Sequence, residues 1–372
     1  MVTAVPVNQS DESWMARALV LASFGATTTS PNPRVGCVIV RDGVNVGEGY
    51  HQRAGTGHAE VHALAAAGDQ APGATAYVTL EPCSHYGRTP PCADALIAAG
   101  ISRVVCAMQD PNPQVAGTGL ARLAAAGIDI CLGVLSQDAE RMNRGFLQRM
   151  RTGKPWLTLK LACSLDGATA MGSGESQWIT GTEARADVQR ARSQSCAILS
   201  GIGTVLSDDP SLNVRLDGCD RQPDRVILDT QLNTPTSARL LTLPGKTWLL
   251  HSSAASAQRV SALTAAGAKL VLMPHNEDGW LDLAAVSVWL GQQQFNEVWA
   301  EPGARLAGAL LQAGQVDEVW LYQAPVLLGA DTRPLIATKM ASLAQRLELT
   351  LLDVRSVGQD LRLQLRPQVR SL

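Results

Sequence analysis

The sequence predicts an α/β protein made of two domains, and three observations support this prediction. The chain has 372 residues, and a single domain usually takes roughly 100–200 residues. In both halves, segments with helical periodicity alternate with short apolar strands, which is typical of layered α/β domains. Glycine and proline interrupt this alternation at 150–155, where we expect a linker. The predicted domains therefore span 1–149 and 156–372.

In the first half, predicted helices and strands follow one another along the chain. Asp42-Gly43 separates the first two strands and is a strong hairpin signal. The expected helices cover 10–25, 58–67, 92–99, 117–127 and 137–149. The expected strands cover 35–40, 44–50, 75–80, 104–108 and 128–134. This order predicts a three-layer α/β/α domain.

Three residues of this half have the chemistry of a metal site. His58 is followed along the chain by Cys83 and Cys92. One imidazole and two thiolates fill three corners of a tetrahedral zinc site and leave the fourth open for water. Zinc in such a site lowers the pKa of its water to about 7. Two unrelated cysteines around a turn are the alternative interpretation.

Glu60 follows His58 so closely that it is not an obvious fourth ligand, and we expect it to move protons instead. Positions i and i+2 in mid-helix point roughly 200° apart, so both residues serve one site only at the first helical turn. That end of a helix also favours hydroxide and thiolate. His-x-Glu followed by Pro-Cys-x-x-Cys is described for zinc-dependent nucleobase deaminases. Here the residues 84–91 separate the two cysteines, so the spacing departs from that pattern.

Other polar residues of the first half have plainer interpretations. His62 shares a helical face with His58 and is a candidate ligand. A hydrogen-bonded helix histidine is the better interpretation, because the cysteines already supply soft ligands. We expect His51, at the end of the hairpin, to be structural or to line a substrate site. Cys37 lies within an apolar strand and is expected in the core. The sequence DPNP at 110–113 is a candidate rim loop at the same sheet edge.

The second half predicts a mixed sheet. We expect a helix over 183–192 and strands over 156–162, 196–200 and 297–300, followed by later, antiparallel strands over 318–322, 326–328, 347–354 and 361–365. Gly201-x-Gly203 lacks the third glycine of a dinucleotide-binding fingerprint. The turn at 301–304 opens a helix over 306–312 and is a better anion site, although an ordinary strand–helix turn is the alternative. No motif marks 238–291.

Composition and charge exclude several classes of function. The net charge is −2 and no block of Lys and Arg stands out, so a nucleic-acid partner is not expected. No apolar run approaches the ~20 residues of a membrane span, and the N-terminus lacks the pattern of a signal peptide. The eight cysteines are scattered along the chain, which favours the reducing cytoplasm.

The first half closely resembles a known family. The stretches HAEVHAL at 58–64 and EPCSHYGRTPPC at 81–92 are similar to those of the bifunctional deaminase–reductases of riboflavin biosynthesis, whose motif includes the long insert. NPRVG at 32–36 and DPNP at 110–113 resemble motifs of the same family. The resemblance implies a cytidine-deaminase-like domain. It also implies roles for six residues: zinc ligands His58, Cys83 and Cys92, the proton shuttle Glu60, and the substrate contacts Asn32 and Arg88.

The second half resembles the reductase domain of the same family, at 160–167, 174–180, 204–210 and 301–303. This resemblance implies a dihydrofolate-reductase-like fold that binds NADPH. The implied NADPH residues are Ala162, Trp178, Thr204, Asp208, Thr230, Gly303, Ala304, Arg305, Leu306, Ala307, Gly308 and Ala309. The implied substrate residues are Ser176, Arg192, Leu212, Arg215 and Glu301.

Two chemical roles in this half follow from residue type. Arg192 and Arg215 suit a ribose phosphate, because guanidinium groups bind phosphate through paired N–H donors. Solvated surface arginines are the alternative interpretation. Lys160, Asp208 and Glu301 are the candidates for proton supply during reduction, with Lys160 as a candidate acid/base.

By resemblance, the substrate is 2,5-diamino-6-(5-phosphoribosylamino)pyrimidin-4(3H)-one. It would be deaminated in the first domain, and NADPH would then reduce its ribosyl group to ribityl in the second. The partners expected are this small molecule and further copies of the chain in a homo-oligomer. Two rival hypotheses remain. One is a deaminase of nucleic acid or free nucleosides whose second half only binds. The other is a second domain that binds nucleotide for regulation without catalysis.

Overall fold

The computed structural model describes residues 9–84, 90–112, 116–219 and 221–368. The chain divides into two compact units, Met1–Gly153 and Lys154–Leu372, and each is described by itself. The dividing point falls inside 150–155, and helix α6 (Arg144–Thr152) occupies the first three residues of that segment. The domain limits 1–149 and 156–372 stay a prediction.

The first unit is built on a sheet that has five strands in the described residues, in the order β2-β1-β3-β4-β5. The strands are β1 (Gly36–Arg41), β2 (Val44–Tyr50), β3 (Thr75–Val78), β4 (Arg103–Cys106) and β5 (Asp129–Leu132). β1 pairs antiparallel with β2 and β3, whereas β3, β4 and β5 run parallel. The carboxyl ends of parallel strands meet at one sheet edge, where α/β proteins place their sites.

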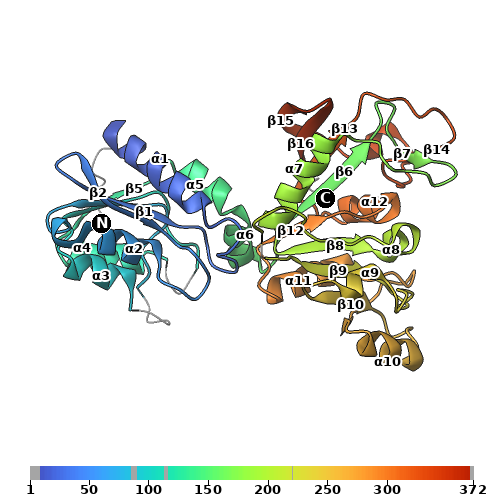
Figure 1. Ribbon diagram of the computed structural model, residues 1–372, viewed down its shortest axis with the longest axis horizontal. Helices are drawn as coiled ribbons and strands as arrows, with labels where there is room; N and C mark the ends of the chain where they lie inside the picture. Colours follow the sequence, from blue (N-terminus) through green and yellow to red (C-terminus); the bar gives the residue numbers. More distant parts are fainter. Residues whose placement is uncertain (1–8, 85–89, 113–115, 220, 369–372) are drawn as a thin grey trace. The chain divides into compact units, whose positions relative to one another are not determined.

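Helices cover both faces of this sheet (Figure 1). They are α1 (Gln9–Ser23), α2 (Ala59–Ala67), α3 (Cys92–Ala98), α4 (Thr118–Ala125), α5 (Ser136–Met142) and α6, with a short 3₁₀ turn, η1 (Gly68–Gln70). One core joins α2, α3 and α4 to the face that includes Ile39 and Val104. The other joins α1, α5 and α6 to the face that includes Val38 and Val105. The predicted three-layer architecture is confirmed, and Cys37 is buried in the first core as expected.

The hairpin between β1 and β2 forms as predicted. Asp42 and Gly43 both have positive φ, 51° and 75°, which is the conformation of a type I′ turn. Further along β2, Gly47 and Gly49 let α2 lie directly on the strand. A Cβ on Gly49 would lie 2.7 Å from the Ala59 carbonyl oxygen. The backbone of β2 therefore sets the position of α2.

The predicted single helix over 137–149 is wrong. The chain forms α5 and α6 with a break at Asn143. The Asn143 side chain accepts a hydrogen bond from Arg34 N at 2.8 Å and donates one to Arg34 O at 2.9 Å. Asn143 itself has φ −108° and ψ 18°, outside the helical range, so the helix is interrupted at the residue whose side chain binds Arg34. Its partner lies far back in the sequence, so local periodicity did not reveal the break.

The second unit is built on a mixed sheet, with nine strands in the described residues in the order β11-β10-β9-β8-β12-β6-β13-β16-β15. These strands are β6 (Trp156–Cys163), β8 (Ala197–Gly201), β9 (Asp224–Leu228), β10 (Thr247–His251), β11 (Lys269–Leu272), β12 (Glu297–Ala300), β13 (Glu318–Gln323), β15 (Leu349–Val357) and β16 (Asp360–Pro367). β16 pairs antiparallel with β13 and β15, whereas the other pairs are parallel. The predicted mixed sheet is confirmed.

Helices also cover both faces of this second sheet. They are α7 (Thr182–Gln194), α8 (Ile202–Asp208), α9 (Arg239–Thr242), α10 (Ala257–Ala265), α11 (Leu283–Gln292) and α12 (Ala304–Gln312), with the 3₁₀ turn η2 (Leu343–Gln345). α11 and α12 share a core with Leu159 and Val298. α8, α9 and α10 pack with Ile198 and Leu249, and α7 packs beside Trp299. The motif-free segment 238–291 therefore supplies scaffold, from α9 to α11.

The predicted strand over 326–328 is wrong. Leu328 N and Gly329 N donate instead to the Asp166 carboxylate, at distances of 2.8–3.2 Å. These N–H groups are therefore not available for a strand ladder. The sequence did not predict a short antiparallel pair of strands, β7 (Ala168–Met171) with β14 (Thr332–Pro334). β14 begins a few residues after this segment.

Candidate functional sites

His58, Cys83 and Cys92 come together in the first unit. His58 is the N-cap of α2, Cys83 lies in the turn after β3, and Cys92 is the first residue of α3. The His58 Nδ1 atom lies 3.6 Å from Cys83 Sγ and 3.3 Å from Cys92 Sγ. All three donor atoms lie within 4.8 Å of one another.

These donors fit a tetrahedral zinc ion. Zn–N and Zn–S bonds of about 2.1 and 2.3 Å place neighbouring donors roughly 3.6–3.8 Å apart. The backbone N–H of Cys92 donates to Cys83 Sγ at 3.3 Å. Hydrogen bonds from Cys92 and His58 lower the pKa of the Cys83 thiol well below its usual range. The site therefore favours the thiolate, which is the form that binds metal, at Cys83, whereas the contact with Cys83 raises the pKa of the Cys92 thiol.

Glu60 lies in the first turn of α2, beside this cluster, as the geometric argument from the sequence required. Its side chain is only 3% exposed, and burial raises the pKa of the carboxyl group. Its Oε2 atom has no hydrogen-bond partner among the described residues. A buried carboxyl group with a raised pKa and one free oxygen suits proton transfer near neutral pH.

Asn32 and His51 form one side of this site. His51 packs edge-to-face on the His58 ring, with centroids 5.3 Å apart. Its Nδ1 atom lies 3.1 Å from Gly57 O, and its Nε2 atom lies 3.2 Å from Asn32 Nδ2. These contacts assign a neutral ring that donates from Nδ1 and accepts at Nε2. Burial lowers the pKa of His51, which agrees with that neutral form.

One predicted residue of this half stands apart from the cluster. His62 is not among the clustered donors, and its Nε2 atom is buried without a hydrogen-bond partner in the described part of the chain. Arg88 lies outside the described residues.

Asn143 is a residue near this site that the sequence did not reveal. It holds both backbone groups of Arg34, and Arg149 Nη2 donates to Pro31 O at 3.1 Å. The loop that presents Asn32 is thereby attached to α6. An asparagine in the middle of a predicted helix was the available signal.

In the second unit, the predicted residues gather where the strand order reverses. β12 pairs with β8 on one side and β6 on the other. After β8, the chain adds β9 on the side of β8 that faces away from β12. After β12, it adds β13 on the side of β6 that faces away from β12, so the sheet grows in the opposite direction. Ligands of open α/β sheets bind at such switch points, outside the carboxyl ends of the strands. Ala162 in β6, Gly201 in β8 and Glu301 after β12 lie at these ends.

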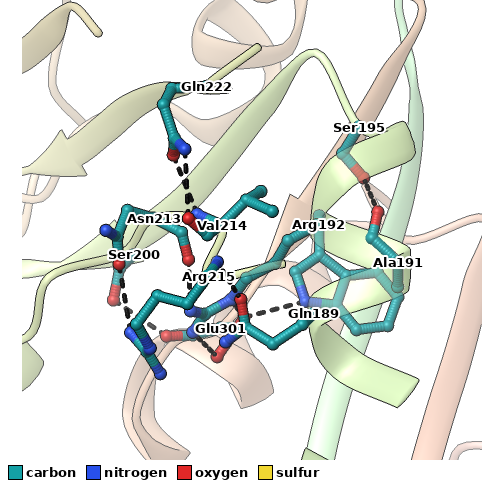
Figure 2. A network of polar contacts seen from close by, with 11 residues as sticks. Gln189, Ala191, Arg192, Ser195, Ser200, Asn213, Val214, Arg215, Gln222 and Glu301 are labelled. Carbon is teal, nitrogen blue, oxygen red and sulfur yellow. Dashed lines mark hydrogen bonds and ion pairs between the residues drawn. The ribbon is translucent and has the colours of Figure 1, made fainter. Parts of the chain in front are cut away.

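Arg192 and Glu301 form a buried ion pair at this edge (Figure 2). Arg192 donates to both carboxylate oxygens, at 2.6 and 2.9 Å, and to Asn213 O at 2.9 Å. Trp299 Nε1 donates to Glu301 Oε1 at 2.9 Å. Three of the five N–H donors of Arg192 are thus occupied, which leaves two for any phosphate.

The charged groups around Glu301 affect the pKa of its carboxyl group and the pKa of the nearby Lys160. Arg192, Lys160 and Trp299 stabilise the carboxylate against the cost of burial, and they lower the pKa of Glu301 to about 2. Burial lowers the pKa of Lys160, while the carboxylate of Glu301 opposes that change. At neutral pH, Glu301 is therefore an anion and carries no proton to donate.

Arg215 is exposed, in contrast to Arg192. Its guanidinium group donates to Asn213 Oδ1 at 3.0 Å, and its backbone N donates to Gln189 Oε1 at 2.9 Å. Gln222 binds both backbone groups of Val214. Figure 2 shows these side chains around the segment that carries Arg215. Gln189 and Gln222 are further positioning residues that the sequence did not reveal.

The remaining predicted substrate residues differ in exposure. Leu212 is buried in the core with Ile198, so only its backbone is available to a ligand. Ser176 is half-buried in the loop before α7. Trp178, in the same loop, is 67% exposed, with the Arg185 guanidinium 4.6 Å from its ring centroid.

The predicted NADPH residues fit a cofactor in part. Gly303 is the exposed N-cap of α12, and a Cβ there would lie 3.7 Å from Thr204 Oγ1. An open helix N-terminus of this kind suits a phosphate group. Ala307 and Gly308 lie on the buried face of α12. A Cβ on Gly308 would lie 2.1 Å from Thr338 Oγ1. Ala307 and Gly308 are therefore closed to a ligand.

The other residues of the predicted NADPH set lie on α8, after β9 and on α12. Asp208 is exposed at the end of α8. Thr230 follows β9, and its carbonyl oxygen accepts from Ser252 N at 3.0 Å. The remaining members of the run are half-buried or exposed: Ala304, Arg305, Leu306 and Ala309.

The two units match two family models. Residues 8–108 match the cytidine and deoxycytidylate deaminase zinc-binding region, and residues 155–363 match the RibD C-terminal domain. Fold and sites thus define a two-domain enzyme that joins a zinc-dependent deaminase to a reductase. The chain belongs to the RibD family of riboflavin biosynthesis proteins, whose members use zinc and NADPH.

Relatives of this family match nearly the full length. The chain is 54% identical to riboflavin biosynthesis protein RibD of Escherichia coli K12, over 95% of this chain and 99% of the relative. It is 46% identical to RibD of Haemophilus influenzae, over 97% and 98%. The structure of Acinetobacter baumannii RibD, form 1, has a TM-score of 0.89 at 46% identity, covering 97% and 99%.

A more distant solved structure has the same architecture. It is a diaminohydroxyphosphoribosylaminopyrimidine deaminase/5-amino-6-(5-phosphoribosylamino)uracil reductase from Thermotoga maritima. Its TM-score is 0.86 at 30% identity, with 96% of this chain and 99% of that chain covered. Among the described residues, no helix combines the length and apolar character that crossing a bilayer requires.

Proposed function

We propose that the first unit deaminates 2,5-diamino-6-(5-phosphoribosylamino)pyrimidin-4(3H)-one. The second unit then reduces the ribosyl group of the product with NADPH, which gives 5-amino-6-(5-phosphoribitylamino)uracil. One observation carries the proposal. A His/Cys/Cys cluster beside a buried carboxyl group occurs in the same chain as a charged cluster at the switch point of a second sheet.

In the first unit we assign His58, Cys83 and Cys92 as zinc ligands and Glu60 as the group that moves protons. Zinc bound there supplies Lewis acidity, which lowers the pKa of water to about 7. Glu60 accepts the water proton, because its raised pKa matches that task. It then delivers that proton to a ring nitrogen. A second proton, from the hydroxyl group that the attack adds to the ring carbon, passes through Glu60 to the amino group, which leaves as ammonia while the C=O bond forms. Asn32 and His51 orient the pyrimidine from the adjoining loop.

In the second unit, the residues bind, orient and supply a proton. NADPH bound here would supply the hydride for C1 of the ribosyl group in its ring-opened imine form. The N-terminus of α12 and Thr204 hold cofactor phosphate. Arg215 binds the ribose phosphate, because its guanidinium group is exposed and only partly engaged. Glu301 stays ionised and holds Arg192, while Lys160 supplies the proton to the reduced product.

We also infer a homo-oligomer in the cytoplasm. Apolar side chains exposed on the edge strand β15 support association, since uncovered edges pair with other chains. Sedimentation velocity would measure the oligomeric state, and cell fractionation the location.

A coupled assay tests the two-step proposal. Wild-type protein is expected to oxidise NADPH when the pyrimidine ribotide is supplied, and not with nucleic acid or free nucleosides. Glu60→Ala should oxidise NADPH only when it is given deaminated substrate, because the second unit is intact. NADPH absorbance measures both reactions.

Two outcomes of this assay would contradict the proposal. If wild type leaves NADPH unchanged even with deaminated substrate, the second unit is not a reductase and the regulatory hypothesis is favoured. If Glu60→Ala oxidises NADPH with undeaminated substrate at the wild-type rate, the order of the steps is wrong.

A further inference from the structure

Glu81 is a buried carboxylate beside the metal cluster that the catalytic scheme does not use. It follows β3, and only Pro82 separates it from Cys83. Its side chain is 3% exposed. It accepts hydrogen bonds from four backbone N–H groups in a later part of the chain.

The four donors belong to two segments. Asp110 N and Gly117 N, in the loop after β4, donate to Oε2 at 3.1 and 2.9 Å. Gly119 N and Leu120 N, in the first turn of α4, donate to Oε1 at 2.9 and 3.2 Å. A carboxylate offers about four lone-pair positions, so the hydrogen-bonding capacity of Glu81 is filled. The free N–H groups of a helix N-terminus also stabilise an anion.

These contacts fix the turn that carries Cys83. A Cβ on Gly119 would lie 2.0 Å from Pro82 O, so α4 packs directly on the peptide that joins Glu81 to Cys83. From the opposite side, Ala93 N donates to Cys83 O at 3.1 Å and Cys92 N donates to Cys83 Sγ at 3.3 Å. The turn is thereby held between the first turns of α3 and α4.

We propose that Glu81 is a positioning residue for the deamination reaction, acting through Cys83. It sets the direction of the Cys83 sulfur and holds the backbone of Asp110 and Gly117 against the same sheet edge. The inference rests on the proposed assignment of Cys83 as a zinc ligand. Metal sites tolerate ligand displacements of only about 0.2 Å, so freeing this turn should change the metal site before it unfolds the unit.

Glu81→Gln tests this inference, and Asp11→Asn is the matched control. Glutamine keeps the shape, but its amide NH₂ would face two of the four N–H donors. Asp11 is an equally buried carboxylate of the same unit, bound to Tyr77 at 2.9 Å and to Arg103 at 2.8 Å. It lies on α1, which packs on the face of the sheet opposite α2. Both variants remove one buried negative charge.

Metal binding separates positioning from general stability. Glu81→Gln is expected to weaken zinc retention against a chelator and to lower the deamination kcat, each by roughly 10–100-fold. It should also alter the absorption bands of the cobalt-substituted full-length protein, which report ligand geometry. Reduction of deaminated substrate should be unchanged. Asp11→Asn should lower the unfolding midpoint and leave the cobalt bands and zinc retention as in wild type.

Wild-type cobalt bands and zinc retention in Glu81→Gln would overturn the positioning role, even if its unfolding midpoint fell as far as that of Asp11→Asn. A wild-type protein that binds no stoichiometric metal would overturn the ligand assignment itself, and the inference with it. Glu81→Asp keeps the charge and shortens the side chain. If the glutamine variant does not fold, the same measurements are made on Glu81→Asp.

Discussion

Glu301 is the residue whose ionisation most clearly links charge to stability. Its pKa in the folded protein is about 2, compared with an ordinary value of 4.5. A lowered pKa of this kind stabilises the folded state fully above pH 4.5, and the contribution is lost as the pH falls toward 2. Arg192 and Trp299 supply the hydrogen bonds responsible.

Glu301→Gln should therefore remove an acid-dependent part of the stability. Between about pH 6 and about pH 3, wild type should lose on the order of 2 kcal/mol more unfolding free energy than the variant. Urea titration followed by tryptophan fluorescence measures this difference, because every tryptophan except Trp14 lies in the second unit. Parallel pH profiles for the two proteins would contradict the assignment of this pKa to Glu301.

The role of a residue was predictable from the sequence where the residue belongs to a short motif with a fixed spacing. The spacing of His58 and Glu60 required a helix start, and α2 begins there. Partners far apart in the sequence were not predictable. Arg192 was expected to bind a ribose phosphate, which stays a prediction. Its ion pair with Glu301, which local patterns do not place beside it, was not foreseen. Arg215, whose exposed guanidinium group donates a hydrogen bond to Asn213, fits the predicted phosphate role better.

Helix α2 positions two site residues and rests on Gly47 and Gly49, two residues of β2 that have no side chain. Gly47 and Gly49 of β2 face its backbone. A Cβ on Gly49 would lie 2.7 Å from both Ala59 O and Ala63 N, and backbone atoms at that distance have to move. The first turn of α2, with His58 and Glu60, would move with them.

Gly49→Ala is expected to lower the stability of the first unit by about 1–3 kcal/mol and to reduce its zinc content and deamination rate. Glu48→Ala is the matched control, since it removes a surface ion pair with Arg17 that contributes at most about 1 kcal/mol. Zinc analysis and thermal unfolding compare the two. Equal zinc content in both variants would contradict the role of this close contact.

Elements that depend on distant partners account for the errors in the predicted fold. Asn143, where the predicted helix breaks, binds the backbone of Arg34. Leu328, in the segment 326–328 that does not form a strand, donates its backbone N–H to Asp166. Neither partner lies within the window over which periodicity is read. Alternation of helix and strand was enough for the layered architecture of both units. It did not define the elements of 238–291, because that segment supplies core packing without site chemistry.

The two units have separate cores, so loss of the metal should affect only one reaction. Treatment with a zinc chelator is expected to abolish deamination and leave the NADPH-dependent reduction of deaminated substrate unchanged. Ammonia release and NADPH absorbance measure the two rates on the same sample. Loss of both activities in parallel would show that the metal also supports the second unit.

The place of β6 in its sheet determines when that sheet is able to form. Both strands that pair with β6, which are β12 and β13, follow it by more than a hundred residues. During synthesis, the apolar β6 therefore leaves the ribosome long before either neighbour exists. Contacts of such high sequence separation slow folding and leave strand edges exposed. We expect the second unit to be the part of this chain that depends on chaperones while it is being made.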